Sequence, residues 1–133
     1  MLRGMQLSLT GSSAGSVATE GTVPFDTVDF NNTVGVVSSH GTITIGKAGT
    51  YLVNWWVAME NAQAAESLSF ALSLNGIDVQ TSYADIGGGQ IYGTAIVNVT
   101  GVPATLTLVN TSSAAVTLVT AAKQAGLTVT QFA

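Results

Sequence analysis

The chain has 133 residues, of which 47% are hydrophobic and only 8% are charged, and its formal net charge at pH 7 is -4. One domain fits this length, so we expect a single unit over residues 1–133, with residues 1–4 as a start segment before it. Three Lys and Arg residues are too few for a phosphate-binding patch or a polybasic anchor, which argues against nucleic acid and membrane surfaces as partners. No apolar run reaches the ~20 residues of a membrane-spanning helix, and the absence of Cys excludes disulfides and thiolate metal sites.

The first third of the chain predicts short strands, because helix signals are weak where Gly, Thr and Val dominate. Met5–Thr10 alternates between apolar and polar residues, and the following residues 11–21, rich in Gly, Ser and Ala, are expected to form a loop. Val23–Asp26 and Thr42–Ile45 read as further strands, and a turn at 46–49 follows the second. The opening residues lack the charged start and long apolar core of a secretory signal.

The longest predicted strand, Tyr51–Met59, is largely apolar on both faces. One face carries Tyr51, Val53, Trp55, Val57 and Met59, and the other carries Leu52, Asn54, Trp56 and Ala58. A strand that is covered on one side only shows polar residues on its other face. We therefore expect this strand to be buried twice, once within its own domain and once against something outside it.

A β-hairpin is predicted in the middle of the chain. Leu68–Leu74 and Ile77–Tyr83 both alternate, and they flank Asn75–Gly76, a preferred sequence for a type I′ turn. Residues 60–67, rich in Ala and Gln, are expected to form the loop before the hairpin, and the three glycines at 87–89 should break the chain after it.

The last third of the chain adds four predicted strands, Gln90–Thr100, Ala104–Val109, Ala115–Thr120 and Leu127–Phe132. About nine or ten short strands with frequent turns predict an all-β, antiparallel sandwich or jelly roll rather than a βαβ arrangement. The first and last strands commonly pair in such folds, so we expect the two ends of the domain to lie close together.

Residues that could carry chemistry are few and scattered. His40 is the only histidine, and Ser39 beside it would point to the opposite face of a strand, which argues against a Ser-His-acid triad. Asp26 and Asp29 could share a calcium ion, although two carboxylates at this spacing are also ordinary loop residues. Residues 87–89 lack the strand, helix and lysine context of a phosphate loop. We therefore expect no enzymatic activity, no metal and no cofactor.

The aromatic residues have two competing interpretations. Tyr51, Trp55 and Phe70 are expected to fill the core, as large rings in alternating strands usually do. Trp56 and Tyr92 are candidates for a subunit interface, where Trp and Tyr are enriched. A carbohydrate-binding platform is the alternative for Trp56.

Two segments, VPFD at 23–26 and GKAGTYLV at 46–53, resemble the signature of the C1q and tumour-necrosis-factor jelly-roll superfamily. Its most characteristic part is Gly49 followed two residues later by Tyr51. With its low charge and its abundance of Thr, Ala and Gly, the chain is most similar to the C-terminal domain of collagen-like glycoproteins of the bacterial exosporium, a spore surface layer. The resemblance covers nearly the whole chain, but the collagen-like Gly-X-Y repeat is missing from these 133 residues.

The resemblance implies a ten-stranded, homotrimeric jelly roll at the tip of an upstream collagen-like stalk. It adds Phe25 and Val53 to the expected core and carries over no metal site. It turns one face of the long strand toward the three-fold axis, where the terminal strand would join it. The residues expected at the trimer interface are Leu52, Asn54, Trp56, Tyr92, Leu127 and Val129.

The leading hypothesis from the sequence is the trimerising, surface-display head of a collagen-like spore-surface glycoprotein, structural and adhesive, and located outside the cell. The alternative is a glycan- or receptor-binding module, which includes the tip of a phage tail fibre. An enzyme is the third hypothesis, and it rests only on His40 and scattered carboxylates.

Overall fold

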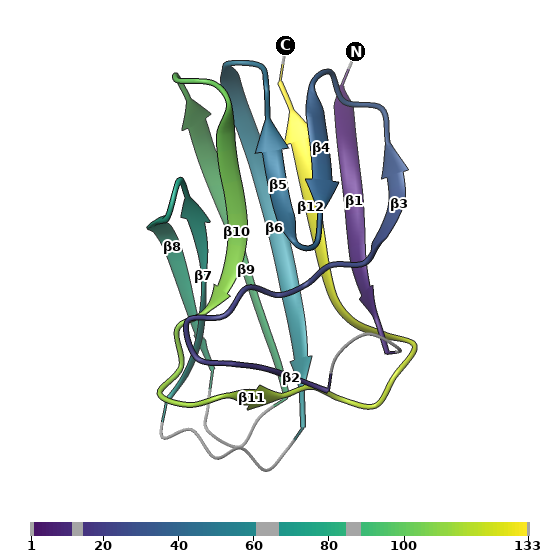
Figure 1. Cartoon of the computed structure of the whole chain (residues 1–133), viewed down its shortest axis with the longest axis vertical. Coiled ribbons are helices and arrows are strands. Elements are labelled where there is room, and N and C mark those ends of the chain that lie inside the picture. Colours follow the sequence, from purple (N-terminus) through teal and green to yellow (C-terminus); the bar gives the residue numbers. More distant parts are fainter. Residues whose placement is uncertain (1, 12–14, 61–66, 85–88, 133) are drawn as a thin grey trace.

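The computed structural model describes residues 2–11, 15–60, 67–84 and 89–132. Within these ranges the regular structure is all β, and two five-stranded antiparallel sheets pack face to face as a jelly-roll sandwich (Figure 1). The predicted fold class is therefore confirmed. No helix in the described part of the chain is long and apolar enough to cross a membrane.

Each sheet draws its strands from distant parts of the sequence. In spatial order the first sheet contains β3 (Thr27–Asn31), β1 (Arg3–Thr10), β12 (Lys123–Gln131), β6 (Gly49–Met59) and β9 (Gly89–Val99). The second sheet contains β4 (Val36–Ser39), β5 (Thr42–Ile45), β10 (Ala104–Asn110), β7 (Leu68–Leu74) and β8 (Ile77–Ala84). A small third sheet pairs β2 (Ser16–Val17) with β11 (Val116–Thr117) near the lower end of the view in Figure 1.

The hydrophobic core lies between the two large sheets and takes alternate residues from their strands. Trp55, Tyr51 and Phe70 are its largest fully buried side chains, and Phe25 and Val53 are buried with them. All five residues that the sequence suggested for the core therefore lie inside the sandwich.

A cluster of hydrogen bonds around Tyr51 gives a physical reason for the tyrosine of the Gly49-x-Tyr51 motif. The Tyr51 hydroxyl donates to the Lys47 carbonyl at 2.5 Å and accepts from Gln131 Nε2 at 3.3 Å. Gln131 also donates to the Val34 carbonyl and accepts from the Val34 amide, each at 3.0 Å. The cluster joins the last strand to two loops that are distant in the sequence.

Two hairpins of the second sheet turn through residues with positive φ. Asn75 and Gly76 have φ of 53° and 85°, as a type I′ turn requires, which confirms the predicted hairpin between β7 and β8. His40 and Gly41 have φ of 51° and 85° and connect β4 to β5 in the same way. His40 is thus an exposed turn residue.

Several strand boundaries differ from the sequence prediction. Val23–Asp26 is not a strand, because Pro24 has no amide to donate and the segment crosses between the sheets. The strands β3 and β4 were not predicted, and only two residues of Ala115–Thr120 form a strand. The predicted loop at 61–66 and the glycines at 87 and 88 lie outside the described residues.

The first strand begins earlier than expected. Arg3 and Gly4 were expected to precede the domain, but they pair with Gln131 and Thr130 of β12, and Arg3 Nη1 donates to the Asn32 carbonyl at 3.0 Å. Because β1 and β12 are antiparallel neighbours, the two ends of the chain leave the sandwich at the same end (Figure 1). The predicted closeness of the first and last strands is confirmed.

We predict that Gln131→Met lowers the free energy of unfolding by about 1–2 kcal/mol. The substitution removes the side-chain hydrogen bonds of Gln131 with the Val34 amide, the Val34 carbonyl and the Tyr51 hydroxyl. The measurement is urea denaturation at one fixed protein concentration. Gln80→Met on exposed β8 is the matched control and should change stability by less than about 0.5 kcal/mol. Equal losses in both variants would contradict the structural role given to Gln131.

Candidate interaction surface

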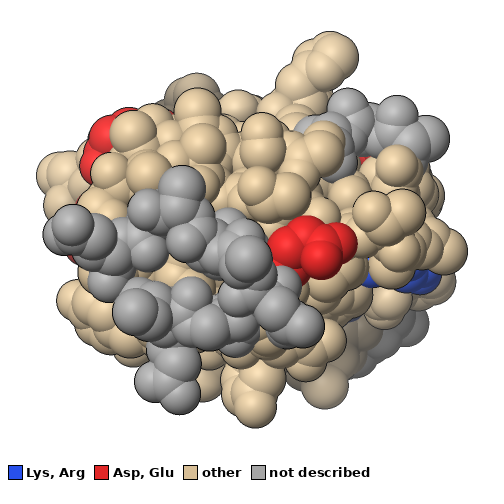
Figure 2. Space-filling model, turned by 90° about the horizontal axis from the view of Figure 1, so that it is seen from below, with Lys and Arg blue, Asp and Glu red and all other residues tan. Residues whose placement is uncertain are grey.

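The outward face of the first sheet is free of charge on two neighbouring strands, β6 and β9. On β6 this face carries Leu52, Asn54 and Trp56, and neither β6 nor β9 contains a charged residue anywhere along its described length. Figure 2, which looks onto one end of the sandwich, shows blue and red atoms only as isolated patches among other residues. We call the outward side of β12, β6 and β9 the neutral face.

Two large apolar side chains stand out from the neutral face on its edge strand, β9. Tyr92 is 70% exposed and Ile96 is 73% exposed, and Thr94 lies between them. Exposed apolar residues scattered singly are normal, but two on one side of an edge strand beside a half-buried Trp form a patch. Such patches mark places where a protein binds something.

Both tryptophans of β6 rest against glycines of the neighbouring strands. Trp56 lies over Gly126 of β12, where an added Cβ would overlap the indole ring. On the other side of the sheet, Trp55 fills the space beside Gly93 of β9 and also approaches the Ser82 hydroxyl of β8. The two glycines therefore decide where the rings can lie, and alternation of apolar residues alone did not reveal this.

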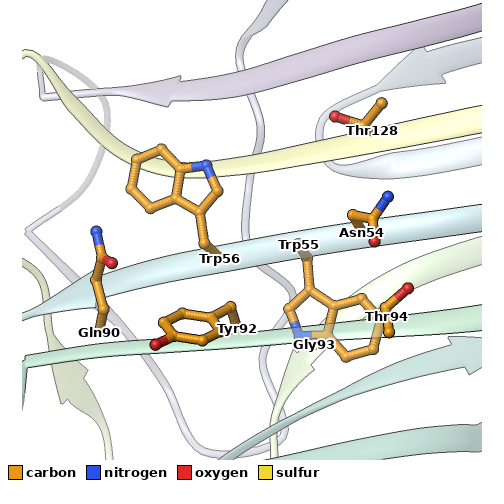
Figure 3. A pocket seen from close by; sticks show the side chains of 8 residues that line it. All are labelled: Asn54, Trp55, Trp56, Gln90, Tyr92, Gly93, Thr94 and Thr128. Carbon is orange, nitrogen blue, oxygen red and sulfur yellow. The ribbon is translucent and has the colours of Figure 1, made fainter.

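A hollow of about 610 Å³ opens on the neutral face beside these rings (Figure 3). It is lined by Asn54, Trp55, Trp56, Gln90, Tyr92, Gly93, Thr94 and Thr128. Its polar groups are amides and hydroxyls without charge, and Trp56 and Tyr92 supply aromatic rings. The Nε1 atom of Trp55, whose ring lies on the core side of β6, is buried without a hydrogen-bond partner among the described residues.

The structure brings four of the six predicted interface residues together on the neutral face. Asn54, Trp56 and Tyr92 line the hollow, and Leu52 lies half-buried further along β6. Leu127 and Val129 are 2% and 0% exposed, because the apolar positions of β12 point into the core. The phase expected for the last strand is thus reversed, and Thr128 and Thr130 take the outward positions.

Three of the candidates for catalysis and metal binding border a single hollow, separate from the one on the neutral face. His40 borders a separate hollow of about 420 Å³ with Ser39 and Asp26 among its lining residues. The Asp26 carboxylate accepts hydrogen bonds from Thr10 and Thr27. Within the described residues, no group of three or more His, Cys, Asp or Glu side chains is placed to hold a metal ion.

Comparison with known proteins shows similarity of fold. No family model and no curated protein matches the sequence. The structure is similar to that of Eiger TNF from S. frugiperda, with a TM-score of 0.78 and 10% identity over 99% of this chain and 93% of that chain. A structure of murine APRIL at pH 5.0 gives a TM-score of 0.76 at 10% identity and covers 99% of this chain and 100% of that chain. The PRD1 vertex protein P5 gives 0.64 at 19% identity, over 98% of this chain and 97% of that chain. These similarities establish a TNF-like jelly roll.

We predict that Gly93→Ala lowers the free energy of unfolding by about 1–3 kcal/mol, because the added methyl group must displace the Trp55 ring or the Ser82 side chain. Gly101→Ala is the control, since a Cβ there meets nothing within 4 Å and should cost almost nothing. Thermal or urea unfolding of both variants measures the difference. A Gly93→Ala protein as stable as Gly101→Ala would show that Trp55 does not need this glycine.

Proposed function

We propose that this chain is a non-enzymatic, trimerising head domain that presents a surface outside the cell. The observation that carries the proposal is the neutral face, with Tyr92 and Ile96 exposed on β9 and no charged residue on β6 or β9. Burial of such side chains against another chain removes apolar surface from water, which stabilises the assembly by roughly 25 cal/mol per Å².

A second copy of the same chain is the partner that this surface fits best. An interface core is poor in charged residues and rich in Tyr and Trp, which describes the area around Trp56 and Tyr92. The superfamily resemblance of the sequence implies a homotrimer, and the TNF-like jelly roll supports that stoichiometry. Closed cyclic assemblies are also the usual form of soluble homo-oligomers.

The finer proposal is the display head of a collagen-like bacterial spore-surface glycoprotein, with a structural and adhesive role. It is supported by the sequence signature at 23–26 and 46–53 and by a surface built almost without charge. The start of β1 lies beside the end of β12. An upstream stalk would therefore join at that end of the head and leave the opposite end facing outward.

The hollow on the neutral face favours a second candidate, a receptor- or glycan-binding module such as a phage tail-fibre tip. Trp56 and Tyr92 offer aromatic surfaces, and Asn54, Gln90 and Thr94 offer neutral hydrogen-bonding groups around them. Sugars without charge need both kinds of group. The two candidates compete for the same face, because a trimer interface there would cover the hollow.

We predict that the wild-type protein has three times the chain mass of 13.5 kDa in solution and that Ile96→Glu dissociates it. The variant would place a charge in an apolar contact, which costs several kcal/mol when no partner neutralises it. Ile77→Glu on β8 is the matched control, because Ile77 is 71% exposed but lies on the second sheet. Light scattering during size-exclusion chromatography at micromolar concentration measures all three proteins, and a monomeric wild type would refute the proposal.

Titration with uncharged oligosaccharides separates the two candidates. If the neutral face is the subunit interface, we expect Trp fluorescence of the wild-type trimer to stay unchanged across the titration. A saturable change that disappears in Tyr92→Ala, in a protein that is monomeric by light scattering, would instead support the glycan-binding candidate.

A further inference from the structure

Exposed apolar side chains occur at both edges of the first sheet. On β9 they are Tyr92 and Ile96, and on the opposite edge strand, β3, the outward one is Phe30, which is 57% exposed. An edge strand with exposed large hydrophobic residues is normally covered by something, because it otherwise promotes aggregation. The sheet thus offers two separate apolar edges.

The outward face between β3 and β6 is polar, whereas β6 carries the half-buried Leu52 and Trp56. Between the two edges the outward residues include Gln6 of β1 together with Thr128 and Thr130 of β12, and none of these is charged. The charges that do border β3 are already engaged, since the Asp29 carboxylate lies 3.6 Å from Lys123 Nζ. The two edges therefore carry the most exposed large apolar side chains of this face, and a partner that binds there would bury them.

Strand register places Phe30 at the same height along the strand direction as the gap between Tyr92 and Ile96. Across the sheet, Phe30 pairs with Gln6, Gln6 with Thr128, Thr128 with Asn54, and Asn54 with Thr94. Thr94 is the outward residue between Tyr92 and Ile96 on β9. A rotation about an axis that runs along the strands moves a side chain around that axis but does not change its height along it. Phe30 of one copy therefore stays at the height of Thr94 in the next copy.

Three-fold symmetry brings different parts of two copies together, whereas a two-fold axis brings identical patches together. In a ring of three, the β3 edge of one copy can therefore meet the β9 edge of the next, and each copy uses both edges once. The hollow of about 610 Å³ opens at this level, and Tyr92 forms part of its wall. A phenyl ring that enters there can pack edge-to-face against aromatic neighbours.

We infer that the β3 edge of one copy packs against the β9 edge of the next copy, with Phe30 seated between Tyr92 and Ile96. This inference rests on the proposed function, since it specifies which parts of the chain meet in the trimer. It also adds Phe30, which the sequence analysis did not select, to the interface.

Cysteine cross-linking tests this contact, and the chain has no cysteine of its own to interfere. The variant Phe30→Cys/Ile96→Cys is treated with a short bis-maleimide and run on a denaturing gel. Val37→Cys/Ile96→Cys is the matched control, because Val37 is also exposed but lies on β4 of the other sheet. Both variants are first measured by light scattering, so that their assembly state is known before the reagent is added.

We expect covalently linked trimers from the Phe30/Ile96 variant and no product beyond a linked dimer from the control. A chain with one reactive thiol in the interface can be joined to only one other chain, whereas linkage of all three chains requires two. A trimeric mass with equal products from both variants would overturn this inference and leave the proposed function standing. A monomeric mass in wild type would overturn both.

Discussion

The architecture depends on the interior position of β6, which pairs with β12 over residues 51–57 on one side and with β9 over its whole length on the other. A strand paired on both sides can send its side chains only to the two faces of the sheet. Tyr51, Val53 and Trp55 therefore enter the sandwich, and Leu52, Asn54 and Trp56 must face outward. The core and the neutral face are two consequences of one alternating segment.

Local patterns predicted the parts of the fold that local physics determines. The Asn75–Gly76 turn and the alternation around Tyr51 and Trp55 were readable because turn conformation and side-chain phase follow from neighbouring residues. The strands β3 and β4 were missed, since both are short edge strands, and the pairing partner of β3 is distant in the sequence. The reversed phase of Leu127 and Val129 came from carrying over the superfamily interface, although their alternation with Thr128 and Thr130 fits an inward position. The placement of Gly93 beside Trp55 and of Gly126 beside Trp56 depends on cross-strand register, which no single segment reveals.

The low charge of the chain affects how it associates with other chains, which bears on its proposed role. A domain with few charged residues has little electrostatic repulsion to prevent association, so its specificity must come from shape and from the placement of apolar groups. Here the most exposed of these groups lie on two edges of one sheet, and the strands between them carry Thr, Gln and Asn side chains together with the half-buried Leu52 and Trp56. Such a surface favours a closed ring over open-ended stacking when both edges are used within the same assembly.

The side-by-side exit of the first and last strands determines how the domain responds to mechanical load. A force applied between the two ends of one chain would pull Arg3 away from Gln131 and then break the β1–β12 hydrogen bonds one after another. This peeling geometry resists force weakly, because each bond bears the load alone. A head held by a single end of each chain transmits tension without loading that ladder, so a tethered assembly of this fold would be mechanically robust only when it is pulled from one terminus.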